Sequence, residues 1–158
     1  MEQAGSAPQR VLAALQRAGI SAEVRRFEAS TRTAQDAANA IGTNVGQIVK
    51  SLLFLAGDRP VLALMSGSNQ LDPAKLAALT GLEIRKADAA TVRQATGFAI
   101  GGVPPIGFPA PIQTYLDQDL MQYDEVWAAA GTPNHVFGIR PADLFRVTGA
   151  LSADLKRA

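Results

Sequence analysis

The chain has 158 residues, 47% of them hydrophobic, and this size and composition predict one compact domain with a sizeable core. Fifteen basic and fourteen acidic side chains give a net charge of +1, which excludes the strongly basic balance of proteins that coat DNA, so we expect no DNA partner. The absence of cysteine excludes disulfides and thiolate chemistry, and with His135 as the only imidazole we predict neither a metal nor a cofactor.

No stretch approaches the ~20 consecutive apolar residues that a membrane helix needs, so we expect no membrane partner. The N-terminal segment MEQAGSAPQR lacks the basic and apolar segments of a secretory signal. The expectation is therefore a cytoplasmic protein.

The first part of the chain alternates helices and strands. Residues 8–18 place apolar side chains at helical spacing and predict an amphipathic helix, and residues 23–27 indicate a short strand. Thr33 is positioned to cap a helix at residues 34–41, where small side chains favour close packing.

Two apolar runs, at residues 48–55 and 60–65, flank the turn signal Gly57-Asp58. They predict two neighbouring central strands joined as a hairpin. Because both runs are apolar on both faces, the sheet should be covered on both sides.

The second half of the chain predicts shorter elements. An Asp-Pro pair opens a helix at residues 73–79, residues 83–86 indicate a short strand, and Asp88 caps a helix at residues 89–95. Residues 97–111 carry so many Gly and Pro residues that they must form an irregular loop. Strands are expected at residues 112–116, 125–130 and 135–139, before a helix at residues 141–145.

These elements predict a single domain over residues 1–158 with its core at about residues 10–146. The expected fold class is α/β (α+β mixed), with a central mixed β-sheet of about six to seven strands flanked by helices.

Lys50 stands inside an apolar strand and should share a face with Leu52 and Phe54. Burying an unpaired ammonium costs several kcal/mol or lowers its pKa, so a lysine here requires a reason. The alternative is a lysine at the mouth of the strand that extends its amine into solvent.

Two turn-rich segments are further candidates. Gly101-Gly102 lets the backbone approach a ligand closely, and free N–H groups there can hold a carbonyl oxygen or oxyanion, while Pro104-Pro105 stiffens the next part of the loop. Residues 131–135 end in His135. The alternatives are a surface connection, with or without a cis proline, and a hydrogen-bonded structural histidine.

Charge is unevenly distributed along the chain. Residues 94–139 contain no Lys or Arg, so a polyanion should approach from elsewhere. The acidic residues in this stretch are Asp117, Asp119, Asp124 and Glu125. The basic candidates elsewhere are Arg25, Arg26, Arg32, Arg85 and Lys86, with ordinary surface solvation as the alternative interpretation.

In this order and spacing the segments resemble the YbaK/ProX family, which comprises freestanding aminoacyl-tRNA deacylases and the editing domain of bacterial prolyl-tRNA synthetases. The resemblance spans about residues 10–145. It rests on residues 33–38 followed by 48–52, where Lys50 matches the signature lysine, on residues 101–105, which fit the G-x-x-x-P loop, and on the glycine-containing turn at residues 131–135. Residues 67–72 depart at Ser68 from the G-D-x-x-[VL]-[DN] pattern of some members, which leaves the subgroup open.

The resemblance implies a mischarged aminoacyl-tRNA as substrate and water as the attacking group, with Lys50 as the catalytic residue. In this family the 2′-hydroxyl of the tRNA is thought to help activate the water. The substrate-binding residues that we expect around Lys50 are Phe27, Thr33, Ser51, Gly101, Gly102, Pro105, Gly131, Asn134 and His135.

Among edited amino acids alanine is the first choice, with serine, threonine, cysteine and 2-aminobutyrate as competitors, on tRNA-Pro or a related tRNA. Two other functions stay open. One is a noncatalytic module that binds tRNA or a nucleotide, and the other is a protein that docks on an aminoacyl-tRNA synthetase through the acidic stretch at residues 117–125. The sequence does not predict an oligomeric state.

Overall fold

A long antiparallel hairpin forms the centre of the sheet. In the computed structural model, which describes residues 6–28 and 33–158, β2 (Ile48–Ala56) pairs with β3 (Arg59–Ser66). The register places Val49 opposite Ser66 and Ala56 opposite Arg59. The hairpin that the two apolar runs predict is therefore confirmed.

The remaining strands extend the hairpin into one eight-stranded sheet in the order β1-β7-β6-β2-β3-β5-β8, with β4 pairing with β2 off this path. These strands are β1 (Val24–Arg26), β4 (Ile84–Lys86), β5 (Gln113–Asp117), β6 (Val126–Ala129), β7 (His135–Ile139) and β8 (Leu151–Ala153). The β2–β6, β3–β5 and β5–β8 pairs are parallel and the others antiparallel, so the predicted mixed sheet is confirmed.

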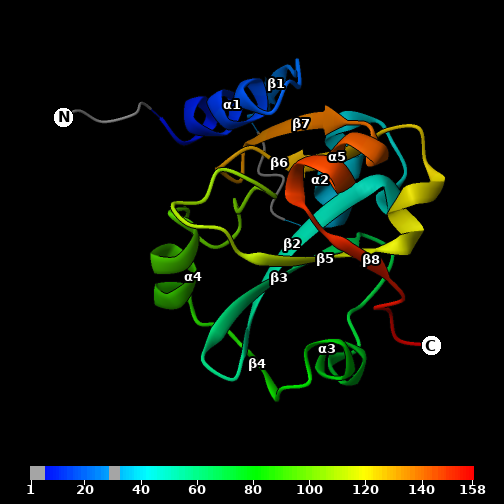
Figure 1. Cartoon of the computed structure of the whole chain (residues 1–158). Coiled ribbons are helices and arrows are strands. Elements are labelled where there is room, and N and C mark those ends of the chain that lie inside the picture. The colour runs from blue at the N-terminus through cyan, green and yellow to red at the C-terminus, as the bar shows by residue number, and fades with distance from the viewer. Residues whose placement is uncertain (1–5, 29–32) are drawn as a thin grey trace.

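Helices cover both faces of this sheet (Figure 1). On one face Val49 and Leu53 of β2 belong to a buried cluster with residues of α1 (Ala7–Arg17), α4 (Ala89–Thr96) and α5 (Pro141–Thr148). On the other face α2 (Ala34–Ile41) packs on Ile48, and α3 (Pro73–Thr80) packs near Leu52 and Phe54. The alternation of β2 thus places Lys50 between the α2 and α3 clusters.

The helices begin where their capping residues predict. Thr33 Oγ1 accepts a hydrogen bond from the Asp36 N–H at 3.0 Å, and Asp88 Oδ1 accepts one from the Thr91 N–H at 2.8 Å. α5 continues to Thr148, three residues beyond the expected end. Within the described part of the chain, no helix has the length and apolar character needed to cross a membrane.

Three short elements were not predicted. They are the 3₁₀ turns η1 (Val45–Gln47) and η2 (Gln118–Gln122) and the last strand, β8. β8 has only three residues, two of them exposed, so it shows no alternation that could indicate a strand. Its pairing with β5 places the C-terminal segment along the edge of the sheet.

Candidate functional site

A split in the sheet opens the site. β6 pairs with β2 only at Ile48 and Val49, and β4 pairs with the same edge of β2 only at Phe54–Ala56. Between them, residues 50–53 have β3 on one side and, within residues 6–28 and 33–158, no strand on the other. An interrupted edge leaves room beside a strand, because neighbouring strands would otherwise lie only ~4.8 Å away.

A cavity of about 460 Å³ lies at this split. Its wall comes from α2, from the β2 segment that includes Lys50, Ser51 and Leu52, from β6 and β7, and from the loop residues Ile100, Gly101 and Val103. The size falls in the usual range for small-molecule sites. The split therefore brings the strand lysine and the glycine-rich loop to one hollow.

Lys50 is half-buried in the wall, and its ammonium donates a hydrogen bond to the backbone carbonyl of Asn69. Burial lowers the pKa of Lys50 below its ordinary value of 10.5, and the nearby Asp117 carboxylate partly opposes this. An ammonium has three donors, and the carbonyl of Asn69 takes one of them. The Lys50 ammonium is therefore fixed by one hydrogen bond and keeps further N–H donors for a bound molecule.

Ser51 also contributes to the wall, and its Oγ is buried with no hydrogen-bond partner among the described residues. Neighbouring residues of a strand point to opposite faces, so Lys50 and Ser51 reach the cavity from the two sides of the sheet. A buried hydroxyl without a partner costs ~1–3 kcal/mol.

The two glycine-bearing turns touch each other. A Cβ on Gly102 would lie 2.6 Å from Thr132 Cα, so only glycine permits this approach. Gly101, at φ +95°, lines the cavity, and a Cβ there would lie 3.9 Å from Pro133 Cγ. The Gly102 N–H donates to the Ala99 carbonyl at 3.1 Å, which leaves the Gly101 N–H as the candidate donor of this pair.

The structure brings some of the expected residues together and places others elsewhere. Lys50, Thr33, Ser51 and Gly101 line the cavity. The residues outside its wall are Phe27, Gly102, Pro105, Gly131, Asn134 and His135.

Those outside have other contacts. Phe27 and Asn134 tie β1 to the turn before β7, because the Phe27 N–H donates to the Asn134 carbonyl at 2.9 Å. His135 Nδ1 is hydrogen-bonded to Thr132 Oγ1, Gly131 packs on Ala7, and Pro105 lines a second cavity of about 280 Å³.

Sequence reasoning did not single out Trp127, Ile100 or Asn69 as parts of the site. Trp127 and Ile100 line the cavity, and the carbonyl of Asn69 holds Lys50. The alternation of β6 indicates on which face of the sheet Trp127 lies, but it does not indicate which residues surround it there. In the described ranges no three His, Asp or Glu side chains gather as a metal site.

The model of a known family, "Aminoacyl-tRNA editing domain", matches residues 28–147, which include the whole sheet except β1 and β8. The chain belongs to this family.

Individual relatives match most of the length of this editing-domain protein. It is 48% identical to a protein solved as "Crystal structure of a putative trans-editing enzyme for prolyl tRNA synthetase", with TM-score 0.93 over 98% of this chain and 99% of that one. It is 33% identical to "Uncharacterized protein YwhH" of Bacillus subtilis over 77% of this chain and 78% of that protein. It is 27% identical to "Putative Cys-tRNA(Pro)/Cys-tRNA(Cys) deacylase EbsC" of Enterococcus faecalis, over 78% of this chain and 76% of that one.

Proposed function

We propose that the chain is a freestanding aminoacyl-tRNA deacylase, which hydrolyses the ester between a wrongly attached amino acid and the terminal adenosine of a tRNA. The observation that carries this proposal is the half-buried Lys50 ammonium in the wall of a 460 Å³ cavity. Membership of the editing-domain family supports it, and so do the names of the two relatives that refer to editing or deacylation.

In the proposed reaction, water attacks the ester carbonyl carbon, negative charge develops on the carbonyl oxygen, and the bond to the ribose oxygen breaks as that oxygen gains a proton. Lys50 binds the ester or the adjoining sugar-phosphate by charge-assisted hydrogen bonds. The Gly101 N–H is the backbone donor that we assign to the developing oxyanion, a contribution typically worth ~2.7–4 kcal/mol.

Among the described residues of the cavity wall no side chain is an obvious general base, since the titratable one is Lys50, which is held as a hydrogen-bond donor. The proposed activation of water therefore uses the 2′-hydroxyl of the substrate itself. Proton transfer then depends on how the terminal ribose is held, and Lys50 is the group that we propose holds it.

The edited amino acid is proposed to be small, with alanine first and serine, threonine, cysteine and 2-aminobutyrate as competitors, on tRNA-Pro or a related tRNA. Thr33, which caps α2, and Ala34 and Ala37 on that helix present small side chains to the cavity, and Ile41 adds a larger one. A synthetase alone separates side chains that differ by one methylene only modestly, by ~1–3 kcal/mol, so we propose that the editing pocket selects by size exclusion. Charged tRNA places the proposed reaction in the cytoplasm, where a synthetase is the expected neighbour.

A panel of mischarged tRNAs tests this function. The release of each amino acid is measured with the wild-type chain and with Lys50→Ala, against spontaneous hydrolysis. We expect at least one small aminoacyl ester to be lost faster with the wild-type chain only. Binding of tRNA without faster loss of any ester would instead identify a noncatalytic binding module.

A further inference from the structure

Residues 151–157 at the C-terminus, here called the strap, are hydrogen-bonded to the turn that carries Asn69. The Asp72 N–H donates to the Leu155 carbonyl at 2.8 Å, and the Arg157 N–H donates to the Gln70 carbonyl at 2.9 Å. Leu155 is fully buried, and β8 pairs with β5. The strap lies beyond residues 28–147, which match the family model, so that match assigns it no role.

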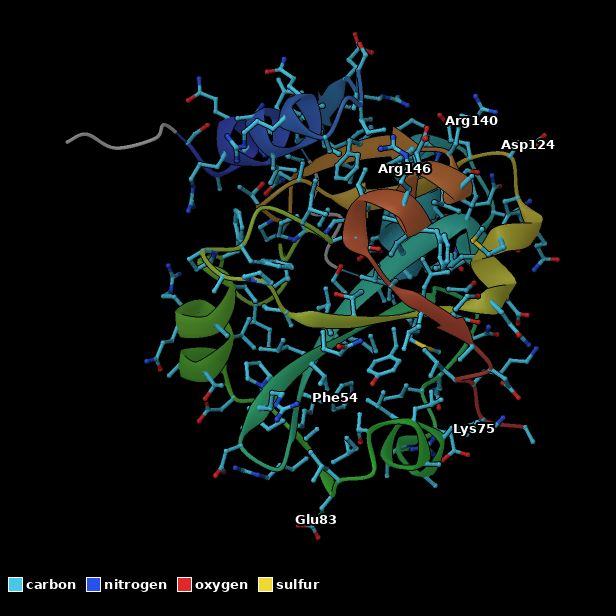
Figure 2. The ribbon with its side chains drawn as sticks, viewed as in Figure 1. Phe54, Lys75, Glu83, Asp124, Arg140 and Arg146 are labelled. Atoms are coloured by element: carbon cyan, nitrogen blue, oxygen red, sulfur yellow. The ribbon has the colours of Figure 1, made fainter. Side chains whose placement is uncertain are left out.

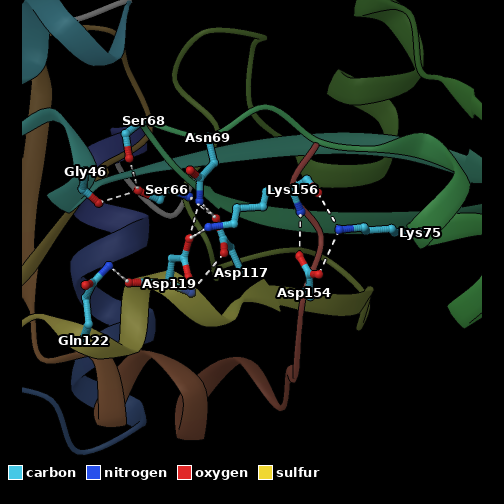
Figure 3. A network of polar contacts seen from close by, with 10 residues as sticks. All are labelled: Gly46, Ser66, Ser68, Asn69, Lys75, Asp117, Asp119, Gln122, Asp154 and Lys156. Atoms are coloured by element: carbon cyan, nitrogen blue, oxygen red, sulfur yellow. Dashed lines mark hydrogen bonds and ion pairs between the residues drawn. The ribbon is translucent and has the colours of Figure 1, made fainter. Parts of the chain in front are cut away.

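A chain of polar contacts leads from the strap to Asn69 (Figure 3), whose backbone carbonyl holds Lys50. Lys156 Nζ donates to Asp119 Oδ2 at 2.8 Å, and the same oxygen accepts from Asn69 Nδ2 at 2.9 Å. Asn69 Nδ2 also donates to Asp117 Oδ2 at 2.8 Å. The backbone carbonyl of Asn69 accepts the hydrogen bond from Lys50.

This arrangement places one amide between two carboxylates. Asp117 is buried, and Asp119 is the more exposed of the two, with a side chain 26% accessible. Like charges that share one donor repel each other unless a cation compensates. Lys156 supplies that cation, and its hydrogen bond is the main cause of the lowered pKa of Asp119.

We propose that the strap is a working part of the site, in which Lys156, through Asp119 and Asn69, positions the Lys50 ammonium in the cavity. This inference rests on the proposed function for its effect on turnover, although the positioning itself is a property of the free protein. Lys156 and Asn69 are positioning residues, because neither lines the cavity.

The consequence of losing Lys156 is a change in where the donors of Lys50 point. Without the cation, Asp119 repels Asp117, and the amide of Asn69 loses one of its two fixed acceptors. The Asn69 carbonyl then no longer has a fixed direction, and Lys50 follows it. A small misplacement of a positioning group can cost as much as ~10²-fold in rate.

The strap offers a matched control. Lys75 of α3 lies beside the strap (Figure 2), where its Nζ contacts Asp154 Oδ2 at 2.8 Å and the Lys156 carbonyl at 2.7 Å. Its side chain is 34% accessible against 44% for Lys156, so the two lysines are similarly exposed. Only the Lys156 pair reaches Asn69.

The test compares Lys156→Met, Lys75→Met and the conservative variant Lys156→Arg. We expect Lys156→Met to lower kcat about tenfold with little change in KM, Lys75→Met to stay within about twofold of wild type, and Lys156→Arg to recover most of the loss. Because exposed ion pairs contribute little to stability, all three variants should fold, which thermal unfolding checks.

A second readout requires no substrate. The chain has four lysines, so the ¹³Cε resonance of Lys50 can be followed by NMR in each variant. We expect it to move in Lys156→Met and to stay in place in Lys75→Met. An unmoved Lys50 resonance in Lys156→Met, or equal loss of turnover in both methionine variants, would overturn the positioning role. If the wild-type chain had no deacylase activity but the Lys50 resonance still moved in Lys156→Met, only the proposed function would be refuted.

Discussion

Lys50 is held in the wall at an electrostatic cost. Burial lowers its pKa, so the folded protein binds this proton less tightly than the unfolded chain does. At neutral pH the charge therefore opposes folding, and the penalty disappears only as the pH rises from the lowered pKa to above 10.5. A residue that destabilises the fold where the cavity lies is typical of a functional site.

The first prediction concerns removal of this charge. Lys50→Met keeps the length of the side chain but has no ammonium, so we expect deacylation to fall nearly to the spontaneous rate. The melting temperature at pH 7 should not fall, because the desolvated charge is gone. Thermal unfolding and ester release in the same preparation check both expectations. Activity close to wild type would remove Lys50 from the mechanism.

The second prediction is the pH dependence of the reaction. The ammonium is the active form, so activity should decrease as pH rises through the pKa of Lys50, with a midpoint below 10.5. Asp117 raises this pKa, and Asp117→Asn should therefore move the midpoint to lower pH. Rates corrected for spontaneous ester hydrolysis provide the measurement. If the midpoint did not move, the decrease in activity at high pH would be due to the titration of another group.

The third prediction uses the unpartnered hydroxyl of Ser51. Because Ser51 Oγ is buried without a partner, Ser51→Ala should raise the free energy of unfolding by ~1 kcal/mol. That corresponds to an increase in Tm of ~2–4 °C for a domain of this size. If the hydroxyl also receives a polar aminoacyl group, KM for a seryl ester should rise more than KM for an alanyl ester. A lower Tm would mean that Ser51 has a partner in solution.

At the level of the elements, local signals in the sequence were sufficient for most of the fold. The apolar runs of β2 and β3 identify the hairpin, and the capping residues Thr33 and Asp88 mark where helices begin. Such features depend on neighbours in the chain. β8 depends on pairing with β5, more than 30 residues earlier, and so has no local signature.

The same distinction explains what could be foreseen of the site. Lys50 stood out because a charge in an apolar strand is a local anomaly, and Gly101 because the backbone there needs glycine. The partnership of Asn69 with Asp117 links residues 48 positions apart. It arises only because β3 and β5 run side by side and end together, which a single sequence does not reveal.

β1 provides the fourth prediction. The Arg25 guanidinium lies 5.2 Å from the centre of the Phe27 ring and 5.4 Å from that of Trp127, which lines the cavity. Gly138 leaves room for the indole, since a Cβ there would lie 3.2 Å from it. An arginine stacked on rings keeps its N–H edge for phosphate, so we expect Arg25→Gln to raise KM for charged tRNA severalfold with kcat little changed.

Arg85 supplies the control for this variant. It lies on β4, at the opposite end of the view from β1 (Figure 1), and is paired with Asp58 at 3.4 Å. Arg85→Gln removes the same charge without touching the cavity, so its KM should match wild type at the same ionic strength. Equal effects of the two variants would point to the overall charge of the protein and not to a surface on β1. Arg32, another basic candidate, lies outside the described residues.

For the whole molecule, a single sheet joins the cores on its two faces. β2 and β3 contribute Leu53 and Leu62 to the cluster beneath α1, and Leu52 and Val61 to the cluster beneath α3. Neither cluster can lose its strands without exposing the other. The strap adds a further link, because Leu155 is buried against the α3 side while Lys156 reaches η2. We therefore expect the described part of the chain to unfold as one cooperative unit.

The last prediction concerns unfolding of this shared sheet. Trp127 is the only tryptophan and reports on β6 beside the cavity, whereas far-ultraviolet circular dichroism reports on all helices and strands. In a urea titration the two signals should give one midpoint and one slope, as expected of a domain that unfolds in two states. An earlier transition in fluorescence would mean that the β1-β7-β6 side separates from the hairpin, in which case the cavity, which is bounded by both, would open before the rest of the protein unfolds.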